Sequence, residues 1–341
     1  MPWFPHNKYL WDFWFARQDG ELHAFYLQAE QAECHFNPDL RHNCSAIGHA
    51  VLTPYGWREM AAPALTRNTG RAWDNLSLWT GSIARDPVTE AHFLFYTARQ
   101  QEDPARWTPS EWQRPQQIGL AVSRDLLTWE RVGRTPVIAN PGRQIGLDGV
   151  AWRDPYVIPD ERGGWLAFIC ARLNPEDRQN SEFGTDAGAV IAWLKSASLD
   201  NWDCYQTRRL VTSDDFYQME VPQVFWRRFA NGKRFYLIFC AQEKDCSRAR
   251  RQRVSADQCR TGTYYLTSDL LPFAEQDVPQ LTGSARLLTE GWYAGRLLDP
   301  ETAATPMFFG FQWADEAGRF VGGISDPMPV QFNEDGSISL T

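Results

Sequence analysis

Three short acidic motifs, far apart in the chain, carry the side chains best suited to chemistry. They are Trp11-Asp12-Phe13-Trp14, Arg153-Asp154-Pro155 and Met219-Glu220-Val221-Pro222. Most enzymes that cut glycosidic bonds use a pair of carboxyl groups, one of which gives a proton to the leaving oxygen. A third carboxylate can hold sugar hydroxyls and stabilise the cationic transition state. Asp12, Asp154 and Glu220 are therefore the candidate catalytic residues of a glycosidase, provided that the fold brings them together.

Each acid also has an ordinary structural interpretation. An Asp before a strand often only caps a turn, which would account for Asp12. Asp-Pro commonly starts a turn, and Arg153 could simply pair with Asp154. Glu220 is harder to explain in this way, because its neighbours are apolar and a buried Glu needs a partner or a function. The three acids together are more specific than any one of them.

The elements that must position these acids are predicted to be β-strands. Short runs rich in β-branched and aromatic residues alternate with turn formers such as Asn231-Gly232-Lys233, and no long amphipathic helical pattern is present. The predicted strands cover residues 21–27, 91–98, 118–123, 165–171, 189–194, 234–241, 262–267 and 307–313. This pattern predicts an all-β fold.

A faint internal repeat organises the predicted strands. Aromatic residues follow similar segments at steps of 72, 73 and 71 residues, at Trp57, Trp129, Trp202 and Phe273. Near-equal spacing of this length is typical of the four-stranded blades of a propeller. With a further strand region after residue 285, completed by residues 322–340, it predicts a five-bladed β-propeller as a single domain over residues 1–341. Innermost strands of the blades line a central channel, so acids near their starts would share one funnel.

Composition narrows the class of partner. The net charge is −8 and basic residues are scattered, which disfavours binding to a polyanion. The basic cluster at residues 248–253 is interpreted as a solvated loop, so we expect no nucleic-acid partner. No secretory signal or membrane-spanning apolar run is found in the sequence. The seven cysteines, an odd number without CxxC spacing, predict reduced thiols and a cytoplasmic location, and the six His lack zinc-ligand spacing with them.

Several motifs, taken in order, resemble a known family. They are Trp11-Asp12, the segment 19–28, Arg41-His42-Asn43, Leu78-Trp79-Thr80-Gly81-Ser82, Arg153-Asp154-Pro155, Glu220 and Trp292-Tyr293-Ala294. The chain is similar to the five-bladed propeller β-fructosidases of glycoside hydrolase family 32, with features of the related family 68 levansucrases. Its first motif is nearer to family 68, and Val-Pro rather than Cys follows the Glu. The chain also ends near the last propeller strand, so we expect no appended C-terminal β-sandwich.

The resemblance implies a retaining hydrolase of β-fructofuranosides such as sucrose or short fructo-oligosaccharides, with no metal or other cofactor. In the family pattern Asp12 is the nucleophile, Glu220 the acid/base and Asp154 the stabiliser of the transition state. Candidate sugar-binding residues, several of them aromatic rings on which a sugar could stack, are Trp11, Trp14, Gln28, Trp79, Ser82, Arg153 and Tyr293. The alternatives are a fructosyltransferase, a propeller arabinofuranosidase and a non-catalytic carbohydrate-binding propeller.

Overall fold

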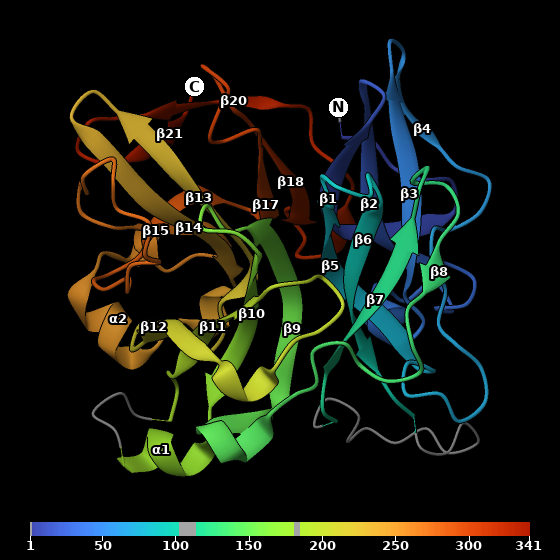
Figure 1. Ribbon diagram of the computed structural model, residues 1–341, viewed down its shortest axis with the longest axis horizontal. Coiled ribbons are helices and arrows are strands. Elements are labelled where there is room, and N and C mark those ends of the chain that lie inside the picture. The colour runs from blue at the N-terminus through green and yellow to red at the C-terminus, as the bar shows by residue number, and fades with distance from the viewer. Residues whose placement is uncertain (1, 102–113, 181–184) are drawn as a thin grey trace.

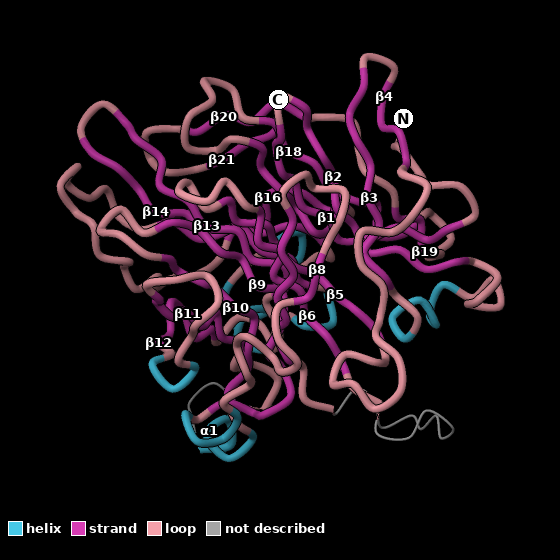
Figure 2. The backbone as a smooth tube through the Cα atoms, turned by 45° about the vertical axis from the view of Figure 1, so that its right-hand side comes forward, coloured by secondary structure: helices cyan, strands magenta, loops and turns pink. Residues whose placement is uncertain are grey.

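Five β-sheets around a common axis make up the body of the protein. The computed structural model describes residues 2–101, 114–180 and 185–341. Over these residues the strands form five antiparallel sheets, arranged as the blades of a propeller (Figure 1). Figure 2 shows that strands make up most of the centre of the molecule and that α1 lies at its lower edge. The predicted all-β, five-bladed architecture is confirmed.

Each of the first four blades is a meander in which consecutive strands pair. Blade 1 consists of β1 (Lys8–Gln18), β2 (Glu21–Glu30), β3 (Ala46–Thr53) and β4 (Gly56–Glu59), and blade 2 of β5 (Ser77–Arg85), β6 (His92–Arg99), β7 (Gln117–Ser123) and β8 (Glu130–Arg131). Blade 3 consists of β9 (Leu147–Pro159), β10 (Trp165–Leu173), β11 (Ala189–Ser196) and β12 (Arg208–Ser213), and blade 4 of β13 (Glu220–Phe229), β14 (Gly232–Ala241), β15 (Gly262–Thr267) and β16 (Arg286–Glu290). Blade 5 consists of β17 (Trp292–Leu298), β18 (Met307–Ala314), β20 (Met328–Phe332) and β21 (Ile338–Leu340), with β19 (Phe320–Gly322) paired to β18.

The eight predicted strands correspond to β2, β6, β7, β10, β11, β14, β15 and β18. These are second and third strands of their blades, buried between neighbours, and they therefore have the most continuous apolar sequences. The repeat is also confirmed, because its aromatic residues lie at equivalent places in blades 1 to 4: Trp57 near the start of the fourth strand β4, and Trp129, Trp202 and Phe273 in the connection from the third to the fourth strand. Residues 322–340 complete blade 5, as predicted.

Helices are short in the described part of the chain. They are α1 (Pro175–Asn180), α2 (Arg248–Arg253) and the 3-10 helices η1 (Pro38–Asn43), η3 (Gly142–Ile145), η4 (Cys204–Gln206), η5 (Glu243–Asp245) and η6 (Ala256–Gln258). None of these helices is long and apolar enough to cross a membrane. All seven cysteines have free thiols.

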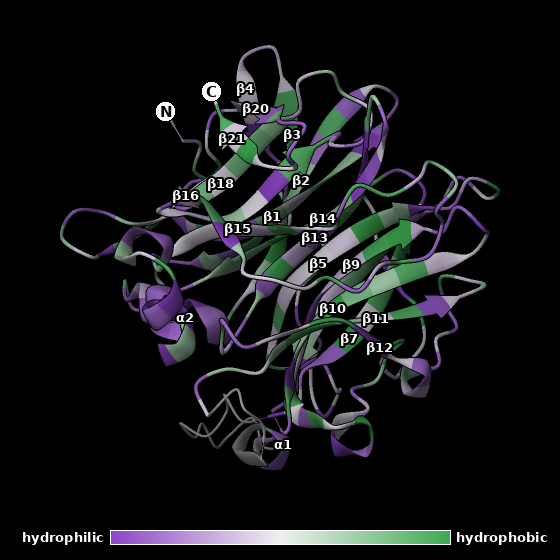
Figure 3. Ribbon diagram, turned by 90° about the vertical axis from the view of Figure 1, so that its left-hand side faces the viewer, coloured by the Kyte–Doolittle hydropathy of each residue, from purple (hydrophilic) through white to green (hydrophobic). Residues whose placement is uncertain are grey.

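The basic cluster at residues 248–253 is largely solvated, as predicted, but it is a helix rather than a loop, and one of its arginines is buried. It forms α2, which is strongly hydrophilic in Figure 3, and the side chain of Ser247 caps it by accepting a hydrogen bond from the Arg250 amide. Arg250 itself is fully buried and forms an ion pair of 2.8 Å with Asp215. Arg250 departs from the prediction because Asp215, distant in sequence, supplies the counter-charge that makes its burial possible.

The inner strands of the blades form a closed ring. β1 contacts β5, β5 contacts β9, β9 contacts β13, β13 contacts β17, and β17 contacts β1 again. The N-terminal segment supports this closure, because Trp3 and Ile324 exchange two backbone hydrogen bonds. Asp12, Asp154 and Glu220 lie on three of these inner strands, so the ring turns their separation in sequence into proximity in space.

Every inner strand is irregular at the same level. In each inner strand the register against the second strand shifts once near the acids or their counterparts. The shift lies between Trp11 and Phe13 in β1, Trp79 and Gly81 in β5, Arg153 and Tyr156 in β9, Glu220 and Gln223 in β13, and Tyr293 and Arg296 in β17. Positive φ angles occur there at Asp12 (31°), Asp154 (57°), Val221 (54°) and Ala294 (50°). Such bulges re-aim side chains and are strained for non-glycine residues. They mark this level of the channel as the candidate site.

Candidate active site

A pocket of about 600 Å³ opens at the level of these bulges. It is lined by Trp11, Asp12, Leu27, Asp39, Arg41, His42, Trp79, Thr80, Gln116, Arg153, Asp154, Arg172, Gln218, Glu220, Val221, Gln242, Lys244, Tyr293, Phe311 and Trp313. The three predicted catalytic acids therefore meet in one cavity, whose size suits a small organic ligand.

Asp12 projects from the bulge of β1 toward the second blade. Its Oδ2 accepts a short hydrogen bond from the hydroxyl of Thr80. Burial and the neighbouring Asp154 raise the pKa of Asp12 to about 7, while the hydrogen bond from Thr80 opposes this shift. The carboxyl group is thus fixed in orientation and titrates close to neutrality.

Asp154 is held by backbone contacts on both sides. Its Oδ2 accepts a hydrogen bond of 3.0 Å from the amide of Val221, and its own amide donates to Thr97 at 2.8 Å. Burial raises the pKa of Asp154 to about 6, with Arg153 lowering it and Glu220 raising it. The bond from Val221 ties Asp154 to the segment that carries Glu220.

Glu220 is held from two sides by hydrogen-bond donors. Arg153 Nη2 donates to Oε1 at 2.9 Å, and the hydroxyl of Tyr293 donates to Oε2 at 2.5 Å. The same Arg153 nitrogen donates to Gln218 at 2.6 Å, and Arg153 Nη1 donates to Gln116 at 3.3 Å. These contacts fix the carboxyl group at the pocket wall, where its side chain stays 20% exposed.

Aromatic rings form part of the pocket wall. Trp11 lies edge-on to His42, with ring centroids 5.4 Å apart, and Arg41 lies over Trp11 at 5.3 Å. The indole nitrogen of Trp79 donates to the backbone oxygen of His42 at 2.9 Å. Burial lowers the pKa of His42 well below its usual value, and the positive charges of Arg41 and Arg99 lower it further. These contacts keep the rings in place beside a cavity that holds several carboxyl groups.

Comparison of the sequence with models of protein families identifies the family of this chain. A model of the glycosyl hydrolases family 32 N-terminal domain matches residues 15–294. The chain belongs to glycoside hydrolase family 32. The match includes Asp154, Glu220 and Tyr293 but begins after Asp12, so the role of Asp12 depends on its position in the pocket.

Solved structures with the same fold come from enzymes of different specificity. The family 32 enzyme is similar to the inulosucrase from Halalkalicoccus jeotgali bound to kestose (TM-score 0.72, 16% identity, covering 100% of this chain and 90% of that one). It is also similar to a family 32 β-fructofuranosidase from Bombyx mori (TM-score 0.66, 16% identity, 97% and 62%). An exo-1,5-α-L-arabinanase from a bovine ruminal metagenomic library gives a TM-score of 0.58 at 12% identity, covering 99% of both chains. No curated protein matches the sequence.

Three predicted sugar-binding residues do not line the pocket of the family 32 enzyme. Trp14 lies two residues after Asp12 in β1, and Ser82 lies two residues after Thr80 in β5. Both line a second cavity of about 460 Å³. Two residues of extended strand carry a side chain roughly 7 Å deeper along the channel. The hydroxyl of Ser82 accepts a hydrogen bond from the amide of Val157. Gln28 is on the second strand of blade 1, where its side chain packs over Gly48.

Other residues of the pocket were not predicted individually. Thr80 and the pair Arg41 and His42 were part of motifs that resemble the family, so their positions were visible but not their contacts. Gln218 had a weaker signal, because it lies two residues before Glu220. Gln242 and Lys244 come from the β14–β15 connection, and Trp313 comes from the second strand of blade 5. No local pattern identifies Gln242 and Lys244, whereas Trp313 lies in the segment 310–313, which resembles the fifth blade of the family.

Proposed function

We propose that this family 32 enzyme is a β-fructofuranosidase that hydrolyses sucrose or short fructo-oligosaccharides with retention of configuration. The observation that supports this most strongly is the convergence of three acids with different partners. Asp12 accepts from a hydroxyl, Asp154 from a backbone amide, and Glu220 from a guanidinium and a phenol. Different partners suit the different roles that the reaction needs.

In the first proposed step the carboxylate of Asp12 attacks the anomeric carbon. The bond between this carbon and the leaving oxygen breaks, and the proton of the Glu220 carboxyl group passes to that oxygen. A fructosyl ester of Asp12 remains. Arg153 and Tyr293 then face a Glu220 that has become an anion, and both can donate hydrogen bonds to it.

In the second step Glu220 takes a proton from water, and the water oxygen attacks the anomeric carbon. The ester bond breaks, which restores the carboxylate of Asp12 and releases fructose. Asp154 is placed to accept hydrogen bonds from sugar hydroxyls while positive charge develops on the ring. Protein carboxyl groups supply both the nucleophile and the proton, so these steps need no cofactor.

The test compares wild type with Asp12→Asn and with Asp200→Asn, a matched change at an exposed position. Each protein is incubated with sucrose, inulin-type and levan-type oligosaccharides, and free fructose is measured. We expect release by wild type and Asp200→Asn but not by Asp12→Asn, and NMR should detect the retained anomer first. Inversion, or equal turnover by Asp12→Asn, would contradict the proposal.

Two alternatives have support from similar structures. The likeness to an inulosucrase favours a fructosyltransferase, in which a sugar hydroxyl replaces water in the second step. New, longer oligosaccharides at high sucrose concentration would identify it. The likeness to an arabinanase favours action on arabinofuranosides, which turnover of an aryl arabinofuranoside without release of fructose would identify. Binding of sugar with no turnover would instead indicate a carbohydrate-binding propeller.

A further inference from the structure

Arg296, on the inner strand of blade 5, connects the two blades beside it. Its side chain is buried, with 2% exposed. Nε donates to the carbonyl of Phe13 at 3.3 Å, and Nη1 donates to the carbonyls of Val221 and Pro222 at 3.2 and 2.7 Å. Phe13 follows Asp12 directly, and Val221 follows Glu220. One guanidinium therefore holds the backbone beside both the proposed nucleophile and the proposed acid.

The separation of these two carboxyl groups decides the chemistry. Retaining glycosidases place them about 5–5.5 Å apart, and a larger gap admits water for inversion. β1 and β13 belong to blades 1 and 4, so blade 5 lies between them in the ring. Arg296 spans this gap with bonds to both strands. Its third nitrogen, Nη2, has no partner among the described residues, and the residue lines the second cavity.

The charge of Arg296 also acts on the carboxyl groups above it. It opposes the rise in the pKa of both Asp12 and Asp154. The other groups that act on these two acids are each other, Thr80, the amide of Val221, Arg41, Arg153, Glu220, Cys170 and Cys240. Arg41 and Arg153 both have further partners. Capping backbone carbonyls requires only N–H groups, whereas a full positive charge at this position also favours ionised carboxylates.

We propose that Arg296 is a positioning residue for the hydrolysis, which fixes the spacing of Asp12 and Glu220 through its bonds to both strands and places a positive charge beneath Asp12 and Asp154. The inference rests on the function proposed above. Its two parts can be separated by substitution. Arg296→Lys retains the charge but loses the fork that spans the two strands. Arg296→Met retains most of the volume but loses both the charge and the bonds.

The test measures the titration of Asp12 directly and the pH dependence of turnover. Wild type and both variants are labelled with ¹³C at the aspartate carboxyl, and the signal missing from Asp12→Asn identifies Asp12. We expect Arg296→Met to raise the pKa of Asp12 by roughly one unit, and Arg296→Lys to leave it near the wild-type value. The acidic limb of kcat/KM on sucrose should move with the Asp12 signal. Arg296→Lys should lose about 10- to 100-fold in kcat through misplacement alone.

Arg250→Lys is the matched control, because Arg250 is also buried and, like Arg296, donates to backbone carbonyls, in its case those of Gln258 and Ala285. It should lower thermal stability without moving either the Asp12 signal or the acidic limb. If Arg296→Met behaves in the same way as this control, the proposal is wrong. The NMR titration needs no substrate, so it decides the role of the charge even if wild type releases no fructose, which would refute the proposed function alone.

Discussion

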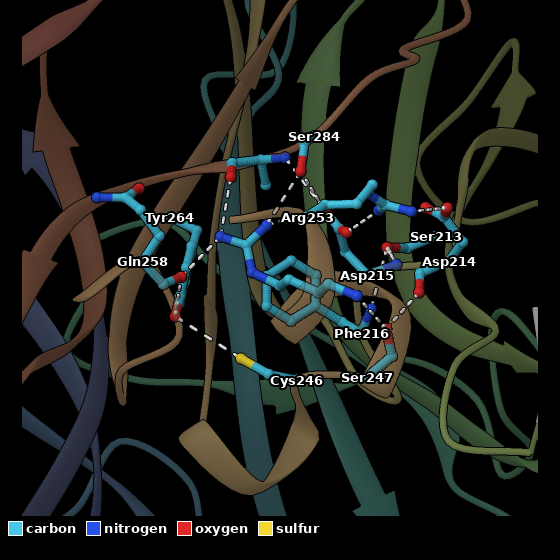
Figure 4. Close-up of polar contacts among 12 residues, drawn as sticks. Ser213, Asp214, Asp215, Phe216, Cys246, Ser247, Arg253, Gln258, Tyr264 and Ser284 are labelled. Carbon is cyan, nitrogen blue, oxygen red and sulfur yellow. Dashed lines mark hydrogen bonds and ion pairs between the residues drawn. The ribbon is translucent and has the colours of Figure 1, made fainter. Parts of the chain in front are cut away.

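Two buried clusters of arginine and carboxylate in this molecule have opposite designs. One is the candidate active site, and the other surrounds Asp215 beneath α2 (Figure 4). Asp215 Oδ2 accepts from Arg250 and Ser284 at 2.8 and 2.7 Å, and Oδ1 accepts a short bond from Arg253. The amide of Ala285 adds a further bond to Oδ2 at 3.3 Å. This carboxylate is thus matched by two guanidinium groups and has both oxygens occupied.

In the candidate active site two acids, Asp154 and Glu220, instead share one guanidinium, that of Arg153. Asp12 and Asp154 repel each other, and Asp12 has a hydroxyl rather than a cation as its hydrogen-bond partner. Both acids also sit on strained backbone with positive φ, whereas Asp215 is not among the residues with positive φ. A buried charge that is fully matched stabilises a fold, and one left short of counter-charge is available for proton transfer or attack. Counting partners therefore distinguishes the structural carboxylate from the carboxylates proposed to react.

The largest expected effect is on kcat, and it compares substitution of Asp12 in the candidate active site with substitution of Asp215 in the structural cluster. Asp12→Asn should lower kcat on the true substrate by roughly 10³- to 10⁵-fold, because the amide cannot form the ester intermediate. Asp215→Asn should leave kcat per folded molecule within about threefold, since none of the side chains that bond Asp215 in the described part of the chain lines the pocket around Asp12. Steady-state kinetics with the folded fraction measured by circular dichroism would check both. A loss at Asp215→Asn as large as that at Asp12→Asn would remove the distinction.

The same pair of variants should show the reverse order in stability. Removing the charge of Asp215 leaves Arg250 buried without its partner, which should cost about 3 kcal/mol. Asp12→Asn should instead stabilise the protein above pH 7. The folded pKa of Asp12, about 7, lies above its usual value of 3.8, so wild type loses stability as the pH rises between these values and the variant does not. Denaturation at pH 4 and pH 8 measures this, and equal differences at both values would contradict it.

The contrast between the clusters also explains what could be predicted from the sequence. Second and third strands such as β10 and β14 are buried on both faces, so their apolar runs identified them. Strands were expected beside the three acids, but the inner strands did not stand out as continuous apolar runs, because they carry polar residues, bulges and prolines such as Pro155 and Pro222. These irregular strands are the ones that position the site. The features that hide them from strand prediction are the features that aim their acids into the channel.

The three acids could be predicted because each lies in a recognisable local motif. Their partners could not, since a hydrogen bond such as that from Thr80 to Asp12 depends on how two blades pack. Arg296 shows the same limit, because its sequence neighbours are ordinary and its importance comes from carbonyls on β1 and β13. Arg250 shows the same limit in a different way. Its basic neighbours indicated a solvated surface, and only the fold reveals Asp215 beside it.

The smallest expected effect lies at the rim of the Asp215 cluster. Arg253 bonds Asp214 and Asp215, yet 42% of its side chain is exposed. Water screens an ion pair at such a position, so Arg253→Gln should cost less than about 1 kcal/mol in unfolding free energy, and added salt should reduce the difference. Arg250→Lys, at a fully buried position, should cost more and respond less to salt. Urea denaturation at low and high salt compares the two variants. A larger loss at Arg253 would mean that the outer guanidinium, rather than the buried one, holds α2 against the blades.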